Sequence, residues 1–192
     1  MAEIKSALEL ALEKAEQYGR ATKEELSRDQ FRDQGRQLAV VFLKDGGDLK
    51  SGLAGLAAAA QPEARRAIKE VLLRNIILPR NGEMDPRMAQ ALEGLLQVAQ
   101  DQKGMIHLKG EVEQLLQNFL QVRNSAYQQL KSRFGANIDQ MQRALEAQMR
   151  QRVNLEVEQI PQFQEEWRRF HGNLVDQFEP MLEALKERML QL

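Results

Sequence analysis

Apolar residues recur at alternating steps of three and four through the middle of this 192-residue chain, and this spacing constrains the fold more than any other feature. It is the heptad spacing of a helix that packs lengthwise along another helix. Further apolar residues widen the stripe beyond a two-stranded seam, so this helix should contact more than one neighbour. The seam residues are Met105, Leu108, Val112, Leu115, Phe119, Val122 and Ala126, and the widening residues are Leu116, Leu120 and Tyr127.

Gly135 and Asn137 predict a tight reversal after this helix. A second apolar stripe then runs over residues 138–160 at about 3.7 residues a step, the spacing of a nearly straight helix. With so short a loop, the helices before and after the reversal must lie antiparallel as a hairpin. Phe119 is therefore expected to face residues 145–153.

The same apolar phase continues to the end of the chain, across two prolines. Proline removes a helical hydrogen bond and clashes with the preceding turn. We predict a break between Ile160 and Pro161 and only a kink at Pro180. The stripe after the break consists of Phe163, Trp167, Phe170, Leu174, Phe178, Met181, Leu185 and Met189.

The first part of the chain predicts shorter helices. Apolar residues over 4–15 form one stripe, and Thr22 followed by Glu25 resembles a capping box for a helix that runs to Leu43. The apolar run 38–43 also fits a buried strand, and helix is preferred because helical signals surround it.

A turn at residues 45–48 separates these elements from the next helices. Asp48 is suited to cap a short helix that reaches Ala60. Pro62 is tolerated in the first turn of a further helix, which Pro79 should end.

The clearest internal boundary follows, near residues 79–85. Pro79 and the dipeptide at 81–82, Asn-Gly, predict an end of helix and a turn. We expect a smaller helical subdomain over residues 1–80 and a long-helix, coiled-coil-like subdomain over residues 86–192.

Composition agrees with an all-α fold. Aromatic residues are only 5% of the chain and there are 5 prolines and 12 glycines, which fits poorly with an all-β sandwich. The fold class predicted is an all-α helical bundle, with a long antiparallel αα-hairpin and a smaller N-terminal helical part.

The sequence lacks the residues that several kinds of catalytic and metal-binding site require. The chain has no cysteine, so disulfides, thiolate nucleophiles and iron–sulfur clusters are excluded. Neither His107 nor His171 has glutamate three residues before it, as a carboxylate di-iron bundle requires. We expect no metal, no cofactor and no enzymatic activity.

The formal net charge of −1 gives no bulk attraction for nucleic acid, and no stretch of about 20 apolar residues predicts a membrane span. Basic pairs remain at residues 65–66, 150 and 152, and 168–169. Arg168 and Arg169 lie next to Trp167, an arrangement that could stack on nucleic-acid bases or bind a phosphate. The alternative is that both arginines are solvent-exposed beside an apolar stripe and have no binding role. The candidate partner-contact residues are Arg74, Asn75, Arg80, Trp167, Arg168 and Arg169.

Three segments together resemble an uncharacterised family of deltaproteobacterial proteins. They are the opening MAEIKSALELALEKAE, the block VLLRNIILPR at 71–80, and PQFQEEWRR at 161–169. The family is a domain of unknown function, so the resemblance implies a bacterial cytoplasmic setting and transfers no residue role.

The predicted function is a non-enzymatic helical scaffold or adaptor that acts through protein–protein contacts. A two-helix hairpin cannot bury the wide apolar faces over 105–134 and 161–192 alone, so either the N-terminal helices or a second subunit must cover them. The N-terminal part offers only short stripes and a polar stretch over 22–37, which favours a homodimer through the C-terminal helices. Two alternatives stay open: an adaptor that binds nucleic acid or a membrane surface through the arginine pairs, and an enzyme of unrecognised class.

Overall fold

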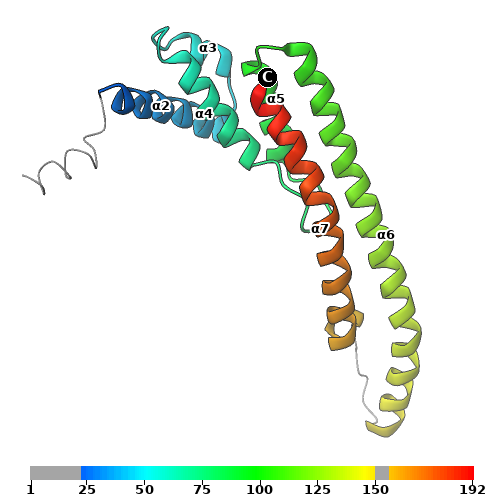
Figure 1. The fold of residues 1–192 in the computed structure, drawn as a ribbon. Helices are drawn as coiled ribbons and strands as arrows, with labels where there is room; N and C mark the ends of the chain where they lie inside the picture. The colour runs from blue at the N-terminus through cyan, green and yellow to red at the C-terminus, as the bar shows by residue number, and fades with distance from the viewer. Residues whose placement is uncertain (1–22, 150–155) are drawn as a thin grey trace, which may run out of the picture. The chain divides into compact units, whose positions relative to one another are not determined.

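The computed structural model describes residues 23–149 and 156–192, and their regular secondary structure consists of helices joined by turns and loops (Figure 1). No strand occurs in these two ranges, which confirms the all-α fold class. Residues 38–43, where a strand was the alternative, lie inside helix α2 (Lys23–Asp45). The predicted stripe over 4–15 and the cap at Thr22 lie outside the described residues.

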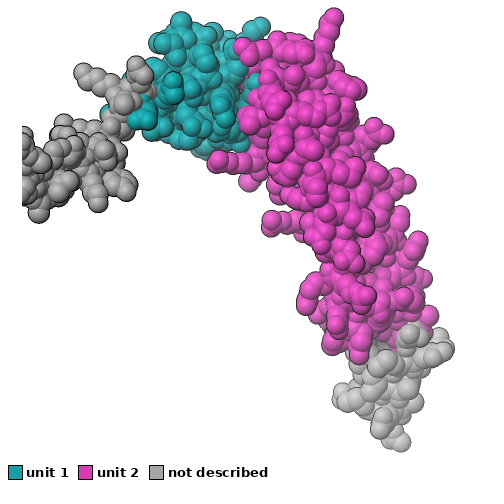
Figure 2. Space-filling view, viewed as in Figure 1, with its two compact units in different colours: residues 1–71 teal, residues 72–192 magenta. Residues whose placement is uncertain are grey.

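The chain divides into two compact units, Met1–Val71 and Leu72–Leu192 (Figure 2). The division falls inside helix α4 (Gln61–Arg74). Residues 79–85, where the sequence placed a boundary, belong to the second unit.

In the first unit, α2 is followed by the expected turn and the short helix α3 (Leu49–Ala54). Gly46 and Gly47 have φ of 76° and 121°, values that favour glycine. The Asp48 carboxylate accepts a hydrogen bond from the Ser51 N–H at 3.0 Å and caps α3, as predicted. The helix ends at Ala54, well before the predicted Ala60.

Helices α2 and α4 approach each other closely at Gly35 and Ala64. A Cβ at Gly35 would collide with the Ala64 backbone, so only glycine fits at this crossing. Beside it, both carboxylate oxygens of Glu70 accept from the Arg32 guanidinium at 3.1 Å. Glycine at a helix interior is thus explained by packing rather than by a turn.

Helix α4 ends at Arg74, four residues before the end predicted from Pro79. The residue before a proline is biased toward extended backbone, so the helix cannot continue into Pro79. Ile76 and Leu78 alternate with the exposed Ile77 and are buried, as they would be in an extended segment. The segment then turns at Gly82, with φ of 81°, and α5 (Pro86–Val98) begins after the capping residue Asp85.

Helix α6 (Gln102–Met149) is continuous, so the predicted reversal at Gly135 and Asn137 is wrong. Gly135 is not among the glycines of positive φ, and a Cβ there would meet open space. One glycine costs a helix interior only about 1 kcal/mol. That penalty is smaller than what the surrounding helical segment gains by staying helical.

The long hairpin exists, but its second arm is helix α7 (Pro161–Gln191), which runs antiparallel beside α6 (Figure 1). Residues 145–149 continue the same helix as Phe119, so the predicted contact with them is wrong, and residues 150–153 lie outside the described residues. The Phe119 ring packs edge-on against Phe178 at 5.4 Å and His171 at 6.2 Å. These aromatic contacts come from α7, and Phe119 is fully buried against them.

The predicted break before Pro161 is confirmed. A short 3₁₀ turn, η1 (Val157–Gln159), precedes Ile160, and Pro161 occupies the first position of α7. Helix α7 continues through Pro180.

Most residues of the α6 seam and of the α7 stripe cover each other within one chain. The N–H groups of Gln100 and Asp101 donate to the Leu192 carbonyl at 3.1 and 3.4 Å, which fixes the end of α7 to the α5–α6 connection. The buried apolar residues of these helices include Met88, Leu92, Leu95, Met105, Leu108, Val112, Leu116, Phe119, Phe163, Leu174, Leu182 and Met189.

Candidate interaction surface

Aromatic rings fill the middle of the α6·α7 seam. Tyr127 of α6 packs edge-on against Trp167 and Phe163 of α7, with ring centroids 4.9 and 5.7 Å apart. Phe134 meets Phe163 in the same geometry at 5.7 Å. Such pairs favour one register of the two helices, because edge-to-face contact requires defined ring positions.

Arg123 joins three parts of the second unit. Its guanidinium carbon lies 5.2 Å from the centre of the Trp167 ring, and its Nη2–H donates to the Arg80 carbonyl at 3.1 Å. Asn124 beside it donates to the Gly82 carbonyl at 3.1 Å. Burial lowers the pKa of Arg123 from its ordinary value. These contacts hold the 75–85 segment against α6.

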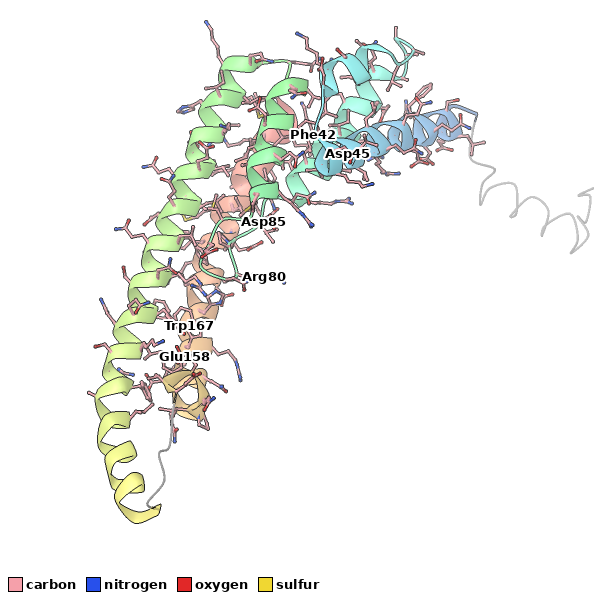
Figure 3. The ribbon with its side chains drawn as sticks, turned by 180° about the vertical axis from the view of Figure 1, so that it is seen from behind. Phe42, Asp45, Arg80, Asp85, Glu158 and Trp167 are labelled. Carbon is pink, nitrogen blue, oxygen red and sulfur yellow. The ribbon has the colours of Figure 1, made fainter. Side chains whose placement is uncertain are left out.

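Glu158, Lys131 and Tyr127 form a hydrogen-bonded triad beside the aromatic seam. The Glu158 carboxylate accepts from the Lys131 ammonium and from the Tyr127 hydroxyl, the latter at 3.1 Å. The Lys131 hydrogen bond lowers the pKa of Glu158, and the pKa of Tyr127 is raised by burial and by Glu158. The carboxylate is thus already engaged by two donors, which suits a structural role. Figure 3 labels Glu158 and Trp167 in this part of the hairpin.

His171 occupies the α7 side of the same region. Its ring lies 5.6 Å from Trp167 and 6.2 Å from Phe119, and its Nε2 is buried without a hydrogen-bond partner. Burial and the Arg123 charge lower the pKa of His171. His107, by contrast, is exposed and pairs with Glu111 at 2.9 Å.

These groups line an open groove of about 790 Å³ on one flank of the hairpin. Its aromatic wall is Tyr127, Phe163 and Trp167, and Arg168 lies at the groove with His171. Since Glu158 is paired, the groove offers cationic and aromatic groups but no unpaired carboxylate among its lining residues.

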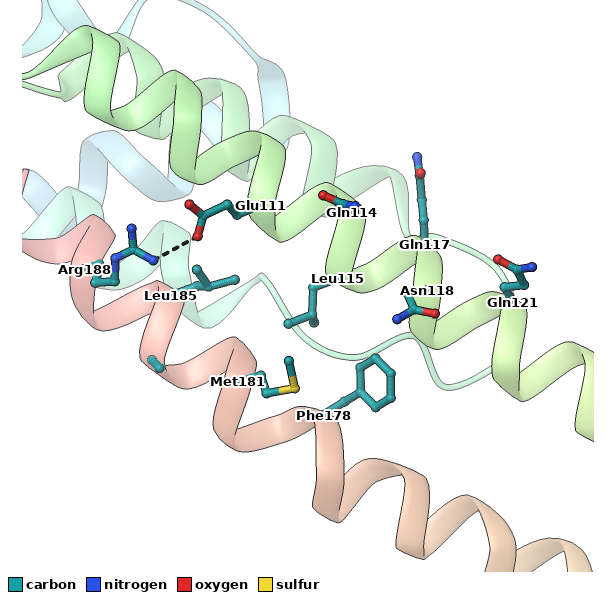
Figure 4. Close-up of a pocket in the computed structure, with 11 residues that line it drawn as sticks. Glu111, Gln114, Leu115, Gln117, Asn118, Gln121, Phe178, Met181, Leu185 and Arg188 are labelled. Atoms are coloured by element: carbon teal, nitrogen blue, oxygen red, sulfur yellow. Dashed lines mark hydrogen bonds and ion pairs between the residues drawn. The ribbon is translucent and has the colours of Figure 1, made fainter.

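The other flank carries two hollows of about 630 and 370 Å³ between α6 and α7. The larger has an apolar floor of Leu115, Phe178, Met181 and Leu185 beneath a rim of amide side chains (Figure 4). Ala126, Leu130, Trp167 and Phe170 line the smaller one.

An ion pair between the two helices closes each end of this flank. Arg188 donates to Glu111 at 2.9 Å at one end, and Arg133 pairs with Glu166 at the other. We call the surface between these ion pairs the neutral face. It consists of Gln114, Leu115, Asn118, Gln121, Val122, Ser125, Ala126 and Gln129 on α6, and Phe170, Asn173, Leu174, Gln177, Phe178, Met181, Ala184 and Leu185 on α7.

The charged residues that line the two hollows lie at the ends of the neutral face. Charged residues make up 29% of the sequence, and the four that line the hollows, Glu111, Arg133, Glu166 and Arg188, form the two ion pairs. Several of its apolar side chains are solvent-exposed: Met181 to 55%, Val122 to 38% and Phe170 to 38%. Depletion of charge around exposed apolar residues is typical of the centre of a protein–protein interface.

The six residues proposed from sequence do not form one cluster. Arg74 ends α4 and is exposed, and Asn75 is half-buried with its N–H donating to the Leu72 carbonyl at 3.0 Å. Arg80 is exposed, and its carbonyl is the acceptor for Arg123. Arg80 and Trp167 are therefore linked through Arg123, a residue that the sequence did not single out.

Trp167 is half-buried in the seam, while Arg168 and Arg169 are exposed. Phe170 stacks on Trp167 at 6.0 Å and 21° between the rings, and it lies on the neutral face. Among the other basic pairs, Arg66 binds Glu70 at 3.3 Å in the first unit, whereas Arg150 and Arg152 lie outside the described residues.

The sequence missed Arg123, His171, Glu158 and Lys131 as members of one cluster. Arg123 lies midway between Phe119 and Tyr127, each one helical turn away, and this spacing marks a residue beside the seam. Glu158 lies outside a helical stripe, in a 3₁₀ turn, and nothing in the sequence indicates its partners.

Over the described ranges, no group of histidine and carboxylate side chains is arranged to hold a metal ion. The helices in the same ranges are all too short or too polar to cross a bilayer.

Fold and surface together define an all-α protein built on an antiparallel pair of long helices, with one cationic aromatic flank and one neutral flank. Residues 50–191 match a family of unknown function, DUF6657, and the chain belongs to this family. The sequence resemblance had implied a family without assigned activity, which this match supports, although the opening segment lies outside the matched residues. No curated protein and no solved structure matches the chain.

Proposed function

We propose that this protein is a non-enzymatic helical scaffold or adaptor that acts through protein–protein contacts and associates with itself as a homodimer. The observation that carries the proposal is the neutral face of α6 and α7, where exposed Phe170, Met181 and Val122 lie among uncharged side chains. The bacterial cytoplasmic setting expected from the sequence is part of the same proposal.

The chemistry of the other flank also supports an interaction role. The groups on this flank whose pKa is shifted are engaged in contacts that hold the fold: Glu158 with Lys131 and Tyr127, and Arg123 with Arg80 and Trp167. The ring of His171 packs between Phe119 and Trp167, and its Nε2 is buried. An active site would instead hold its acid–base groups toward a substrate.

The reason for expecting a dimer is narrower than the one that the sequence suggested. Most residues of the α6 seam and the α7 stripe bury each other, but Val122 of the seam and Phe170 and Met181 of the stripe remain exposed. The surface that favours self-association is the flank of the hairpin on which these three residues lie.

Sedimentation equilibrium of the full chain tests the proposal. Over about 1–100 μM, a dimer of the 22.0 kDa chain gives an apparent mass that rises toward twice that value. An apparent mass of one chain throughout this range overturns the homodimer.

A second candidate is an adaptor that binds anionic surfaces. It is favoured by Arg168, which is exposed at the cationic aromatic groove beside Arg123 and His171. Binding to duplex DNA or to anionic vesicles, measured at two salt concentrations, separates the candidates. Binding that weakens steeply with salt supports the second candidate.

A further inference from the structure

We propose that the neutral face is the dimer interface, and that two copies of the α6·α7 hairpin stack on it in antiparallel orientation to form a four-helix bundle. This inference rests on the proposed function and names the surface and geometry of its self-association.

The dimensions of the neutral face are sufficient for a dimer. It extends over 23 residues on each helix, from Glu111 to Arg133 and from Glu166 to Arg188, or about 33 Å. Two adjacent helices are about 20 Å wide, so a face-to-face dimer buries about 650 Å² per copy. The total of about 1,300 Å² falls within the range of stable specific interfaces.

The end charges are complementary under a two-fold axis. Each helix carries one acidic and one basic residue at its ends: Glu111 and Arg133 on α6, Glu166 and Arg188 on α7. In an antiparallel stack, Glu111 lies opposite Arg133 of the second copy, and Arg188 lies opposite Glu166. Every end charge therefore meets an opposite charge, and the uncharged middle is closed from solvent.

The distribution of amide and apolar residues selects the antiparallel orientation. On the neutral face α6 is rich in amides, such as Gln114, Asn118 and Gln121, whereas α7 presents Phe170, Met181 and other apolar residues. The antiparallel stack places α6 on α6 and α7 on α7. Gln114 then lies near Gln129 of the second copy, and Gln121 lies near its own counterpart. A parallel stack would instead place Gln114, Gln121 and Gln129 opposite Leu185, Phe178 and Phe170, where the amides have no partners.

The two-fold axis of this arrangement passes beside Val122 and Gln177. These residues are the midpoints between the end charges of α6 and of α7, respectively. Each should therefore lie next to its own counterpart in the second copy. A parallel dimer would instead place Val122 of one copy beside Gln177 of the other.

Sedimentation equilibrium of the full-length variant with Val122→Glu and Met181→Glu tests the surface. Both side chains are exposed, so the variant should keep its helical circular dichroism and thermal midpoint while the dissociation constant of the dimer rises at least 100-fold. The control is Ile106→Glu, which changes a residue exposed to 58% that lies off the neutral face. We expect the control to dimerise like the parent chain.

Cysteine cross-linking tests whether the two copies are antiparallel. The chain has no cysteine, so every disulfide formed must involve the introduced residue. We expect Val122→Cys alone and Gln177→Cys alone each to form a disulfide-linked dimer on mild oxidation. Disulfides found only when the two variants are mixed overturn the antiparallel orientation.

A dimer that persists unchanged in the double glutamate variant overturns the neutral face as the interface but leaves the homodimer standing. A single-chain mass at every concentration in the parent chain overturns both. The two failures are therefore distinguishable.

Discussion

The guanidinium of Arg123 stacks over the ring of Trp167 at 5.2 Å and donates to the carbonyl of Arg80 at 3.1 Å. One side chain thus holds α6, α7 and the segment before α5 in register. A planar, multidentate cation is suited to this task, because it can stack and donate in two directions simultaneously.

Replacing Arg123 should loosen this junction. We expect Arg123→Ala to lower the free energy of unfolding of the second unit by roughly 1–3 kcal/mol, since a stacked cation and a hydrogen bond to the backbone are lost. Trp167 is the single tryptophan of the chain, so its fluorescence in a urea titration reports this unfolding directly.

Arg168→Ala is the matched control for Arg123→Ala, because Arg168 is exposed on the same helix as Trp167. Its urea midpoint should equal that of the parent chain. Equal midpoints for both variants would mean that the Arg123 stack contributes nothing to stability.

The continuity of α6 makes a prediction for Gly135. Alanine there should stabilise the second unit by roughly 0.5–1 kcal/mol, because a helical position with open space gains from alanine. Gly110→Ala, also helical with open space, should give a gain of the same size. A loss of stability on Gly135→Ala, with a gain on Gly110→Ala, would indicate the turn that the sequence suggested.

Local rules predicted the features that depend on a few adjacent residues. The Asp48 cap, the turns at 45–48 and 81–82 and the break at Pro161 are examples, because each is determined by backbone preferences. The helical signals on both sides of residues 38–43 correctly predicted that this run is helical.

Features that depend on distant contacts were not predictable in this way. The partner of 105–134 is α7 rather than the stripe after Gly135, and the choice depends on which aromatic residues pack against Phe119 and Tyr127. Trp167 was identified from its position in the stripe. The contact of Arg123 with Trp167, in contrast, can be recognised only when α7 is placed beside α6. The neutral face needs both helices, since neither alone shows ion pairs at the two ends.

The crossing of α2 and α4 predicts the opposite effect for a glycine in the first unit. Gly35→Ala should destabilise this unit by roughly 1–3 kcal/mol, because its Cβ collides with the Ala64 backbone. Trp167 lies in the other unit, so amide hydrogen exchange in α2 and α4 is the suitable measurement. Unchanged protection in both helices would contradict the close crossing.

The environment of His171 predicts a pH dependence of stability. Burial and Arg123 lower the pKa of His171 in the folded chain below its ordinary value of 6.5. The unfolded chain therefore takes up the proton first as the pH falls, and stability decreases from about pH 7 downward until the folded pKa is reached. The urea midpoint, followed by Trp167 fluorescence, should decline as the pH falls from about 7 through the ordinary histidine pKa of 6.5.

The variant His171→Gln should remove most of this decline, because glutamine does not titrate. His107→Gln is the control: it is the only other histidine, its side chain is 75% exposed, and we expect the decline to remain. The carboxyl of Glu158 has its pKa lowered by Lys131, so its titration falls below this pH range and does not obscure the result. If the parent chain and His171→Gln lose stability equally as the pH falls, the buried Nε2 of His171 is not what makes the α6·α7 seam sensitive to acid.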